Sequence, residues 1–286
     1  MKLASFVHEG RTSVGILAGD GVIDLGRRLG VDTMRQLLET GGVEAAAPFA
    51  GEAPDIAVEQ IEFLPVVTDP HHFFCVGVNY ADHLAEAQRA NLPRPTPKQP
   101  SLFIRFPETL TGHRQPLLMP RVSDHFDYEA ELAVIIGKGG RYIPREEALA
   151  HVAGYSCFND GSVRDWQFHS SQVTSGKNFV QTGALGPALV TADEVGDAGN
   201  LDIRLLIDGE TFQHSNTSKL IFDVATIIAY ASSLLPLKPG DVIATGTPEG
   251  VGFAREPQRF LRPGEVCEVV IERVGRLVNP VAKDAS

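Results

Sequence analysis

Apolar residues along the chain fall mainly into short runs, many of them rich in β-branched side chains and bounded by turn residues. Runs of this kind are typical of strands rather than helices. They predict strands at 73–78, 102–106, 128–137, 152–159, 203–208, 241–245 and 266–273. Helical spacing is confined to a few segments, notably 81–89, 145–151 and 219–234. The pattern predicts a mixed α/β, β-rich fold.

The first part of the chain predicts a smaller unit of its own. Residues 2–24 have the pattern of short strands around a Gly19-Asp20-Gly21 turn. A short amphipathic helix follows, with Asp32 as its predicted capping residue. We therefore expect a small N-terminal α+β domain at 1–68 and a larger domain at 69–286.

Composition limits the class of protein. With 286 residues, 43% of them hydrophobic, the chain can bury a large core. Its formal net charge of −11 argues against a nucleic-acid partner, because phosphate binding needs a basic surface. No stretch approaches the roughly 20 apolar residues of a membrane span, and the first residues lack a signal peptide's apolar segment. We expect a soluble cytoplasmic protein with no membrane partner.

The cysteines Cys75, Cys157 and Cys267 are scattered and lie in apolar runs. This distribution predicts buried, reduced thiols rather than a disulfide framework or a zinc site. The negative net charge does not exclude a small anionic substrate, because local cations such as Arg105 together with a metal ion can bind one.

The most informative segment of the chain is the strand that contains Glu129 and Glu131. Residues two apart on a strand point to the same side, so both carboxylates face one place. Asp160 lies at the end of the next predicted strand, and if the two strands are neighbours the three carboxylates converge. Adjacent buried anions need a cation, a shared proton or basic partners, and an all-oxygen site favours Mg²⁺, with Mn²⁺ or Ca²⁺ able to substitute. The alternative is a surface strand whose glutamates face solvent, the commoner fate of a Glu-x-Glu pair.

A second candidate group lies on the predicted helix at 81–89. His83 and Glu86 are three residues apart and share one face of that helix. A carboxylate beside an imidazole orients the ring and raises its basicity, which suits a general base that deprotonates water. The alternative is an exposed helix with an incidental pair, since the chain has nine histidines.

Three further segments carry candidate binding groups. The segment that runs from Arg164 to Gln167 follows Asp160 by one helical turn, which would direct a guanidinium and an amide back toward a metal ion there. Lys177 lies in a glycine-punctuated loop, where a cation can neutralise an enolate or a carboxylate. Thr247 lies in a glycine-rich turn after a strand. That turn is either a plain β-turn or a site whose backbone N–H groups and hydroxyl hold a carboxylate.

Five motifs in this order resemble the fumarylacetoacetate hydrolase family. They are Gly77-Val78-Asn79-Tyr80 followed by His83, Tyr128-Glu129-Ala130-Glu131-Leu132, Phe158-Asn159-Asp160 with Arg164-Asp165-Trp166-Gln167, Gly176-Lys177-Asn178-Phe179, and Gly246-Thr247-Pro248-Glu249-Gly250-Val251-Gly252. The resemblance covers about residues 70–281, and the small N-terminal domain is of the type that many bacterial members carry.

The resemblance implies a mixed β-sandwich roll for the large domain, a homodimer, and a site for Mg²⁺ or Mn²⁺. When the motifs of the family are matched to this chain residue by residue, Glu129, Glu131 and Asp160 resemble the metal ligands of the family. His83 with Glu86 resembles the pair that activates water in the shorter members of the family.

The remaining assignments also follow from the resemblance. Lys177 resembles the lysine that stabilises negative charge in the transition state, and Arg164, Gln167 and Thr247 resemble substrate contacts. Fumarylacetoacetate hydrolase itself has an extra aspartate ligand where this chain has Cys75-Val76-Gly77, so we expect water to complete the metal shell.

A second departure limits how far specificity can be transferred from the family. Many isomerase and decarboxylase members have Lys-Ser-Phe-Asp-Thr where this chain has Lys177-Asn178-Phe179-Val180-Gln181-Thr182. Their substrate preferences therefore do not carry over directly.

The sequence thus predicts a metal-dependent hydrolase of a carbon–carbon bond in a 1,3-dicarbonyl acid, with an anionic acylpyruvate or 2,4-diketo acid as substrate. His83, supported by Glu86, would deprotonate the attacking water, and Lys177 would stabilise the oxyanion and the departing enolate. Isomerisation or tautomerisation of a 2-hydroxydienoate and decarboxylation of oxaloacetate remain alternatives, because one metal-stabilised enolate serves all three. A non-catalytic metal-binding domain is a further alternative, against which the intact His83, Glu86 and Lys177 argue.

Overall fold

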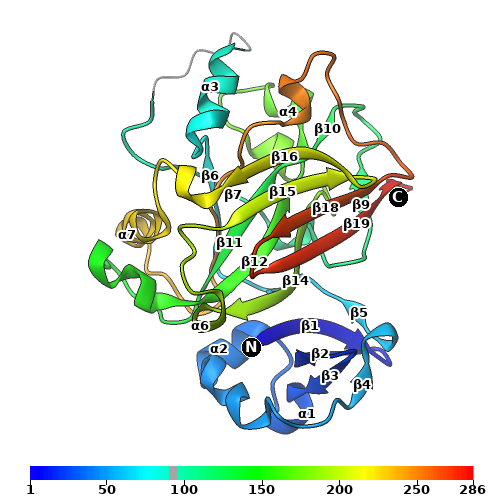
Figure 1. Cartoon of the computed structure of the whole chain (residues 1–286), viewed down its shortest axis with the longest axis vertical. Coiled ribbons are helices and arrows are strands. Elements are labelled where there is room, and N and C mark those ends of the chain that lie inside the picture. The colour runs from blue at the N-terminus through cyan, green and yellow to red at the C-terminus, as the bar shows by residue number, and fades with distance from the viewer. Residues whose placement is uncertain (90–95, 286) are drawn as a thin grey trace.

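The polypeptide forms two large β-sheets and one two-stranded sheet, with short helices around them (Figure 1). The computed structural model describes residues 1–89 and 96–285. The central sheet has the order β4 (Ile56–Ala57), β3 (Gly21–Asp24), β2 (Arg11–Ala18), β1 (Lys2–His8), β14 (Gly183–Thr191), β12 (Val152–Asp160), β11 (Ala130–Ile136), β17 (Val242–Ala244), β6 (Phe73–Gly77) and β7 (Ser101–Ile104). The second sheet has the order β16 (Glu210–Asn216), β15 (Asp202–Ile207), β18 (Val266–Ile271), β19 (Gly275–Lys283) and β9 (Leu117–Met119).

Short strands and helices complete the fold. Strands β5 (Glu62–Phe63) and β8 (Leu110–Thr111) pair with β1 and β14, and β10 (Phe126–Asp127) pairs with β13 (Ser162–Val163). The α-helices are α1 (Leu25–Leu29), α2 (Met34–Thr40), α3 (Ala81–Arg89), α4 (Arg164–Gln167), α5 (Thr174–Lys177), α6 (Ala192–Val195) and α7 (Val224–Leu234). The 3₁₀ helices are η1 (Val43–Phe49), η2 (Val58–Gln60), η3 (Pro107–Thr109), η4 (Arg145–His151), η5 (Thr217–Lys219) and η6 (Gly252–Ala254). Within the described part of the chain, no helix has the length and apolar character needed to cross a bilayer.

Strand β11 is buried on both faces because its apolar residues alternate between two clusters. Leu132 and Val134 belong to the cluster that joins the central sheet to β15 and β18 of the second sheet. Ala133 and Ile135 belong to the opposite cluster, which includes the apolar side of α2. Complete burial of an aliphatic side chain of this size stabilises a fold by about 1.5–3 kcal/mol. The strand that carries Glu131, and that Glu129 directly precedes, is therefore held firmly in place.

The N-terminal strands extend the central sheet, since β1 pairs antiparallel with β14. Figure 1 shows this N-terminal unit, in blue, at one end of the molecule. Helix α2 begins at Met34, and its capping residue is Thr33, whose hydroxyl accepts the N–H of Gln36. The prediction that Asp32 caps this helix is therefore wrong by one residue. Asp32 instead donates its own N–H to the side chain of Gln36.

The structure has the predicted mixed α/β, β-rich character, with local differences. Segment 145–151 forms a 3₁₀ helix, and the predicted helix 219–234 becomes α-helical only at Val224, because Asp223 caps it by accepting the N–H of Thr226. Strands β14, β16 and β19 are not among the predicted strands; β14 contains two glycines and a proline that interrupt the apolar pattern. The three cysteines are buried and free, as predicted.

Candidate metal centre and active site

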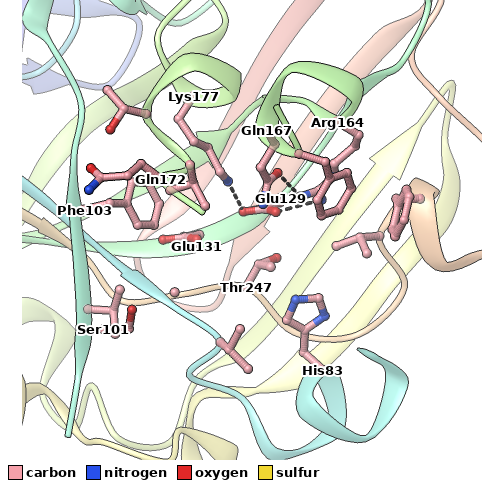
Figure 2. A pocket seen from close by; sticks show the side chains of 18 of the residues that line it. His83, Ser101, Phe103, Glu129, Glu131, Arg164, Gln167, Gln172, Lys177 and Thr247 are labelled. Carbon is pink, nitrogen blue, oxygen red and sulfur yellow. Dashed lines mark hydrogen bonds and ion pairs between the residues drawn. The ribbon is translucent and has the colours of Figure 1, made fainter. Parts of the chain in front are cut away.

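A cavity of about 590 Å³ lies between α3, β7, α4, α5 and the loop that follows β17 (Figure 2). Its polar lining includes all the candidate residues predicted from the sequence except Asp160 and Arg105, namely His83, Glu86, Glu129, Glu131, Arg164, Gln167, Lys177 and Thr247. Its apolar lining includes Val78, Phe103, Phe168, Val251 and Phe253. The fold therefore gathers the predicted groups at one place.

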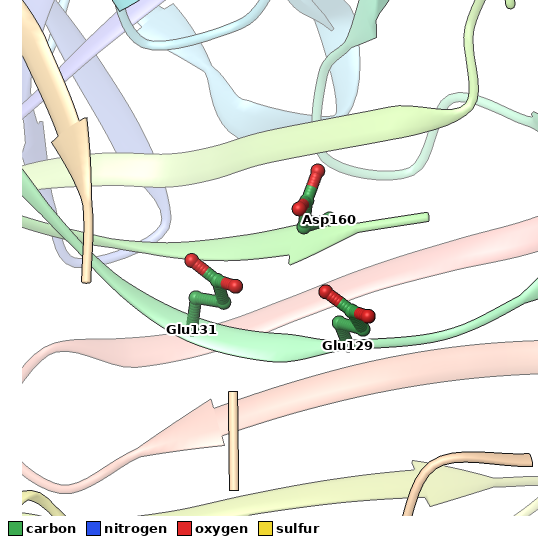
Figure 3. Close-up of side chains that lie close together, drawn as sticks. All are labelled: Glu129, Glu131 and Asp160. Atoms are coloured by element: carbon green, nitrogen blue, oxygen red, sulfur yellow. The ribbon is translucent and has the colours of Figure 1, made fainter. Parts of the chain in front are cut away.

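The three candidate metal ligands lie close together (Figure 3), and two of them, Glu129 and Glu131, line the cavity. Strands β11 and β12 are antiparallel neighbours, and Glu131 lies directly opposite Phe158. Asp160, two residues after Phe158, therefore points to the same face as Glu131 and Glu129. Carboxylate oxygens of Glu129, Glu131 and Asp160 lie within 4.8 Å of one another, and all three residues are buried. The alternative of solvent-facing glutamates does not fit this geometry.

Basic side chains neutralise the negative charge of these three carboxylates only in part. Lys177 Nζ lies 2.7 Å from Glu129 Oε2 and 2.7 Å from Asp160 Oδ2. Arg105 Nη1 donates to Asp160 Oδ1 at 2.5 Å. Glu131, by contrast, has no basic side chain within ion-pair distance among the described residues, and its Oε2 accepts the backbone N–H of Gly246 at 2.9 Å.

The pKa values of the two glutamates reflect this imbalance. Burial on its own raises the pKa of Glu129, but Lys177 and Arg164 outweigh this effect and lower it to about 2. Burial also raises the pKa of Glu131, and the neighbouring charges of Asp160 and Glu129 raise it further, to well above its usual range. A cation beside Glu131 would favour its ionised form.

A divalent metal ion fits this donor set. Carboxylate oxygens without sulfur or imidazole are the ligands that Mg²⁺ and Mn²⁺ prefer. The buried acids of the cluster and its surroundings are Asp127, Glu129, Glu131 and Asp160, whereas the buried bases that pair with them are Arg105, Arg164 and Lys177. A doubly charged ion would change this balance from net negative to net positive, which suits an anionic substrate.

The predicted histidine–glutamate pair is formed on α3 and faces the cavity. His83 Nδ1 lies 2.9 Å from Glu86 Oε2, and Glu86 Oε1 accepts the backbone N–H of Gly250 at 2.8 Å. The start of the helix is fixed by Asp82, whose Oδ2 accepts a hydrogen bond from Ser215 at 2.9 Å. Among the described residues, the other ring nitrogen of His83, Nε2, has no hydrogen-bond partner and can serve in proton transfer. The alternative of an incidental exposed pair does not fit, because both side chains are largely buried and line the cavity.

Arg164 is bound mainly by protein groups. Its Nε donates to Asp127 Oδ2 at 2.7 Å, and its Nη1 donates to Gln167 Oε1 at 2.9 Å. Its Nη2 lies 2.7 Å from Glu129 Oε1 as an ion pair, but it is not in line for a hydrogen bond and has no hydrogen-bond partner in the described chain. That nitrogen is buried against Glu129, so all three guanidinium nitrogens of Arg164 face protein groups and the guanidinium mainly orients Glu129.

The glycine-rich loop after β17 was considered above as a site whose backbone N–H groups hold a substrate carboxylate. In the structure these groups have other partners. The N–H groups of Gly246, Gly250 and Gly252 donate to side chains of the protein itself, namely Glu131, Glu86 and Asp127. They are therefore not free to hold a substrate carboxylate. The Thr247 hydroxyl does line the cavity, as Figure 2 shows.

Sequence reasoning missed the roles of Asp127 and Gln213, and it considered Arg105 for the substrate, whereas Arg105 is buried and holds a candidate metal ligand. Arg105 binds Asp160, Asp127 binds Arg164, and Gln213 joins Thr247 to strand β11. The position of Asp127, two residues before Glu129, is a usable signal. Gln213 has no comparable signal, because it is a lone amide on a different sheet.

Together, the sandwich fold, the buried carboxylate cluster and the cavity define a metal-dependent enzyme. The chain belongs to the fumarylacetoacetate hydrolase family: residues 72–282 match the family described as "Fumarylacetoacetate (FAA) hydrolase C-terminal". The resemblance seen in the sequence motifs is thereby confirmed at the level of the family.

Curated relatives are similar over most of the chain. A mitochondrial oxaloacetate tautomerase of Xenopus laevis is 41% identical over 255 residues, which are 87% of this chain and 78% of that protein. A mitochondrial oxaloacetate tautomerase of Homo sapiens is 41% identical over 254 residues, which are 87% of this chain and 79% of that protein. These names favour the predicted alternative of tautomerisation over the main prediction of hydrolysis.

Solved structures confirm the fold over its full length. Fumarylacetoacetate hydrolase from Exiguobacterium antarcticum is 32% identical with a TM-score of 0.82, and the match covers 99% of this chain and 100% of the other. Maleylpyruvate hydrolase from Sphingobium sp. SYK-6, in complex with manganese(II) and pyruvate, is 30% identical with a TM-score of 0.80, and 99% of each chain is covered. The similar structures thus include hydrolases.

Proposed function

We propose that this protein interconverts the enol and keto forms of oxaloacetate or of a closely related 2-keto acid, with Mg²⁺ or Mn²⁺ held by Glu129, Glu131 and Asp160. The observation that carries the proposal is a buried carboxylate cluster, incompletely compensated at Glu131, beside a histidine–glutamate pair in one cavity. The names of the tautomerases that are about 41% identical support this reaction over others of the family.

A metal ion bound at the three carboxylates would bind the keto acid and stabilise its enolate as a Lewis acid. The chain's own cations surround that position. Lys177 remains protonated, because Asp160 and Glu129 offset the effect of burial and raise its pKa. Its ammonium group is therefore available to stabilise negative charge on the substrate oxygen.

Tautomerisation requires two proton movements: the enol oxygen loses a proton, and carbon 3 of the acid gains one. His83 is suited to deliver or accept the proton at carbon 3, because Glu86 holds its Nδ1 and its ring lines the cavity, while the enol oxygen passes its proton to solvent water. Glu86 keeps the ring in one tautomer through its two contacts, to His83 and to the N–H of Gly250. Neither water nor carbon dioxide is consumed or released in this scheme.

Hydrolysis of an acylpyruvate is the second candidate. It is supported by the same His83–Glu86 pair, which can instead deprotonate water, and by the similarity to maleylpyruvate hydrolase. The two reactions differ in whether carbon 3 of the substrate or a water molecule reaches His83. Decarboxylation of oxaloacetate would need neither water nor a proton donor before carbon dioxide leaves.

A single experiment separates these reactions. The enol form of oxaloacetate is added to the protein with Mg²⁺ or Mn²⁺, and the decay of its ultraviolet absorbance is followed while carbon dioxide and pyruvate are assayed. We expect faster enol decay with neither product released above the uncatalysed rate. In a parallel reaction, acylpyruvates are supplied in H₂¹⁸O. More efficient formation of a labelled carboxylate than of keto-oxaloacetate would overturn the tautomerase proposal and favour hydrolysis.

A further inference from the structure

Gln213 connects two parts of the active site from the second sheet. It lies on β16 with only 1% of its surface exposed. Its Oε1 accepts the backbone N–H of Ala130 at 2.9 Å, and its Nε2 donates to Thr247 Oγ1 and to Pro248 O, each at 2.9 Å. Ala130 stands between the two glutamates of the carboxylate cluster on β11. One amide thus joins the strand that carries those glutamates to the loop that lines the cavity.

The direction of the bond between Gln213 and Thr247 decides how the Thr247 hydroxyl can act. The backbone N–H of Ala130 can only donate, so the amide atom facing it is the oxygen and the atom facing Thr247 is the nitrogen. Amide nitrogen can only donate, so the hydroxyl oxygen accepts and its own hydrogen remains free. Within the described chain, Thr247 donates that hydrogen to no protein group, and its side chain faces the cavity beside Glu129 and His83.

We propose that Gln213 is a positioning residue that keeps the Thr247 hydroxyl directed as a hydrogen-bond donor toward the carboxylate of the bound keto acid. Gln213 does not line the cavity and acts through Thr247. The inference rests on the proposed function, because it requires an anionic keto acid in the cavity.

The variant Gln213→Glu reverses the polarity of this contact at nearly constant volume. Its carboxylate still accepts from Ala130, but it now also accepts the hydrogen of Thr247, which is lost to the ligand. The probe is oxalate, titrated by calorimetry into protein loaded with Mn²⁺. We expect oxalate affinity to fall about tenfold or more, the usual effect of losing one hydrogen bond to a charged group. Affinity for Mn²⁺ itself should not weaken, because the contact with Ala130 persists.

The new negative charge could itself repel oxalate, and a double-mutant cycle separates the two effects. In a Thr247→Val background, Gln213→Glu should cause no further loss of oxalate affinity. An equally large further loss there, or wild-type affinity in Gln213→Glu alone, would overturn the inference. His214→Gln is the matched control, because His214 is the next residue of β16, is exposed, and pairs with Asp202 on the surface. It should bind oxalate like the wild type.

A second variant keeps the test decisive if thermal unfolding shows that Gln213→Glu is not folded. Gln213→Met removes the donor without adding charge, and it should weaken oxalate about threefold in the wild-type background and not at all with Thr247→Val. Equal losses in both backgrounds would refute the role of the hydroxyl.

If wild-type protein with Mn²⁺ binds neither oxalate nor pyruvate, the proposed function and this inference are both wrong. If the wild type binds oxalate and the variants bind it equally well, only this inference is wrong.

Discussion

Glu131 differs from its two neighbours in the carboxylate cluster in having no basic partner among the residues that the structure describes. Glu129 pairs with Lys177 and Arg164, and Asp160 pairs with Lys177 and Arg105. Separation of like charges and supply of opposite charge decide the stability of buried ions. Loss of one negative charge should therefore have opposite consequences for stability at Glu131 and at Glu129.

We predict that Glu131→Gln abolishes divalent-metal binding while leaving the metal-free fold as stable as the wild type or more stable. The substitution removes one of three ligands and also removes a buried acid that no basic side chain in the described chain compensates. Calorimetry with Mn²⁺ and thermal unfolding measure the two effects. Glu129→Gln is the matched control for stability: it removes one of the two carboxylates that Lys177 and Arg164 each contact, and should lower the free energy of unfolding relative to Glu131→Gln. Wild-type Mn²⁺ affinity in Glu131→Gln would place the metal elsewhere.

We predict that His83→Ala lowers turnover on the order of a hundredfold or more, the usual effect of losing a general base, with Mn²⁺ affinity unchanged. Metal binding should survive because the imidazole is not part of the carboxylate cluster. Steady-state kinetics and Mn²⁺ calorimetry provide the measurements. Substitution of the exposed His214 by Ala should leave both quantities unchanged. Full turnover in His83→Ala would assign proton transfer to another residue.

At the scale of elements, the loop 245–253 is the connection between the separate parts of the site. Its backbone N–H groups hold Glu131 of the carboxylate cluster, Glu86 of α3, and Asp127, which in turn holds Arg164. Glycine is required where the loop turns, since Gly250 has a φ of +100° and a Cβ there would lie 2.3 Å from the carbonyl oxygen of Phe212. The loop therefore couples the position of the His83–Glu86 pair to the position of the metal ligand Glu131.

We predict that Gly250→Ala lowers turnover about tenfold, because the loop must shift and the N–H that holds Glu86 moves with it. Mn²⁺ affinity should change little, because the Gly246 contact to Glu131 is at the other end of the loop. Gly264→Ala is the matched control, since Gly264 has a φ of +96° but a methyl group added there would have nothing within 4 Å. Both variants should lose stability, and only Gly250→Ala should lose turnover. Equal turnover in the two variants would contradict the role of the loop.

At the scale of the whole molecule, the N-terminal unit and the rest of the chain share one apolar cluster. Leu3 and Leu37 from the N-terminal unit pack in the same cluster as Ile135 and Leu189 of the central sheet. That cluster lies on the face of β11 that also carries Glu131, near the start of the strand. The N-terminal unit thus supports the strand that carries the two glutamates.

We predict that the full chain unfolds in one cooperative transition, and that a fragment lacking residues 1–68 has a clearly lower thermal midpoint. Removal of the unit would expose the apolar face of the central sheet, and each aliphatic side chain so exposed loses about 1.5–3 kcal/mol. Differential scanning calorimetry of both proteins checks this. Two separate transitions in the full chain would mean that the unit has an independent core.

Local rules determined the parts of this protein that depend on neighbouring residues along the chain. Strand alternation determined that Glu129 and Glu131 face one side, and helical spacing determined that His83 and Glu86 share a face. The mixed, β-rich fold class follows from the same patterns, because they reflect which side chains can be buried.

Only the tertiary structure decided which distant segments meet these groups. Gly250 and Glu86 are 164 positions apart along the chain, and Gln213 and Ala130 are 83 apart. Their contacts depend on the order and register of strands in two sheets, which apolar periodicity does not specify. The physical reason is that a backbone N–H or a side-chain amide can bond any acceptor of suitable geometry. Its partner is therefore chosen by the packing of the whole chain.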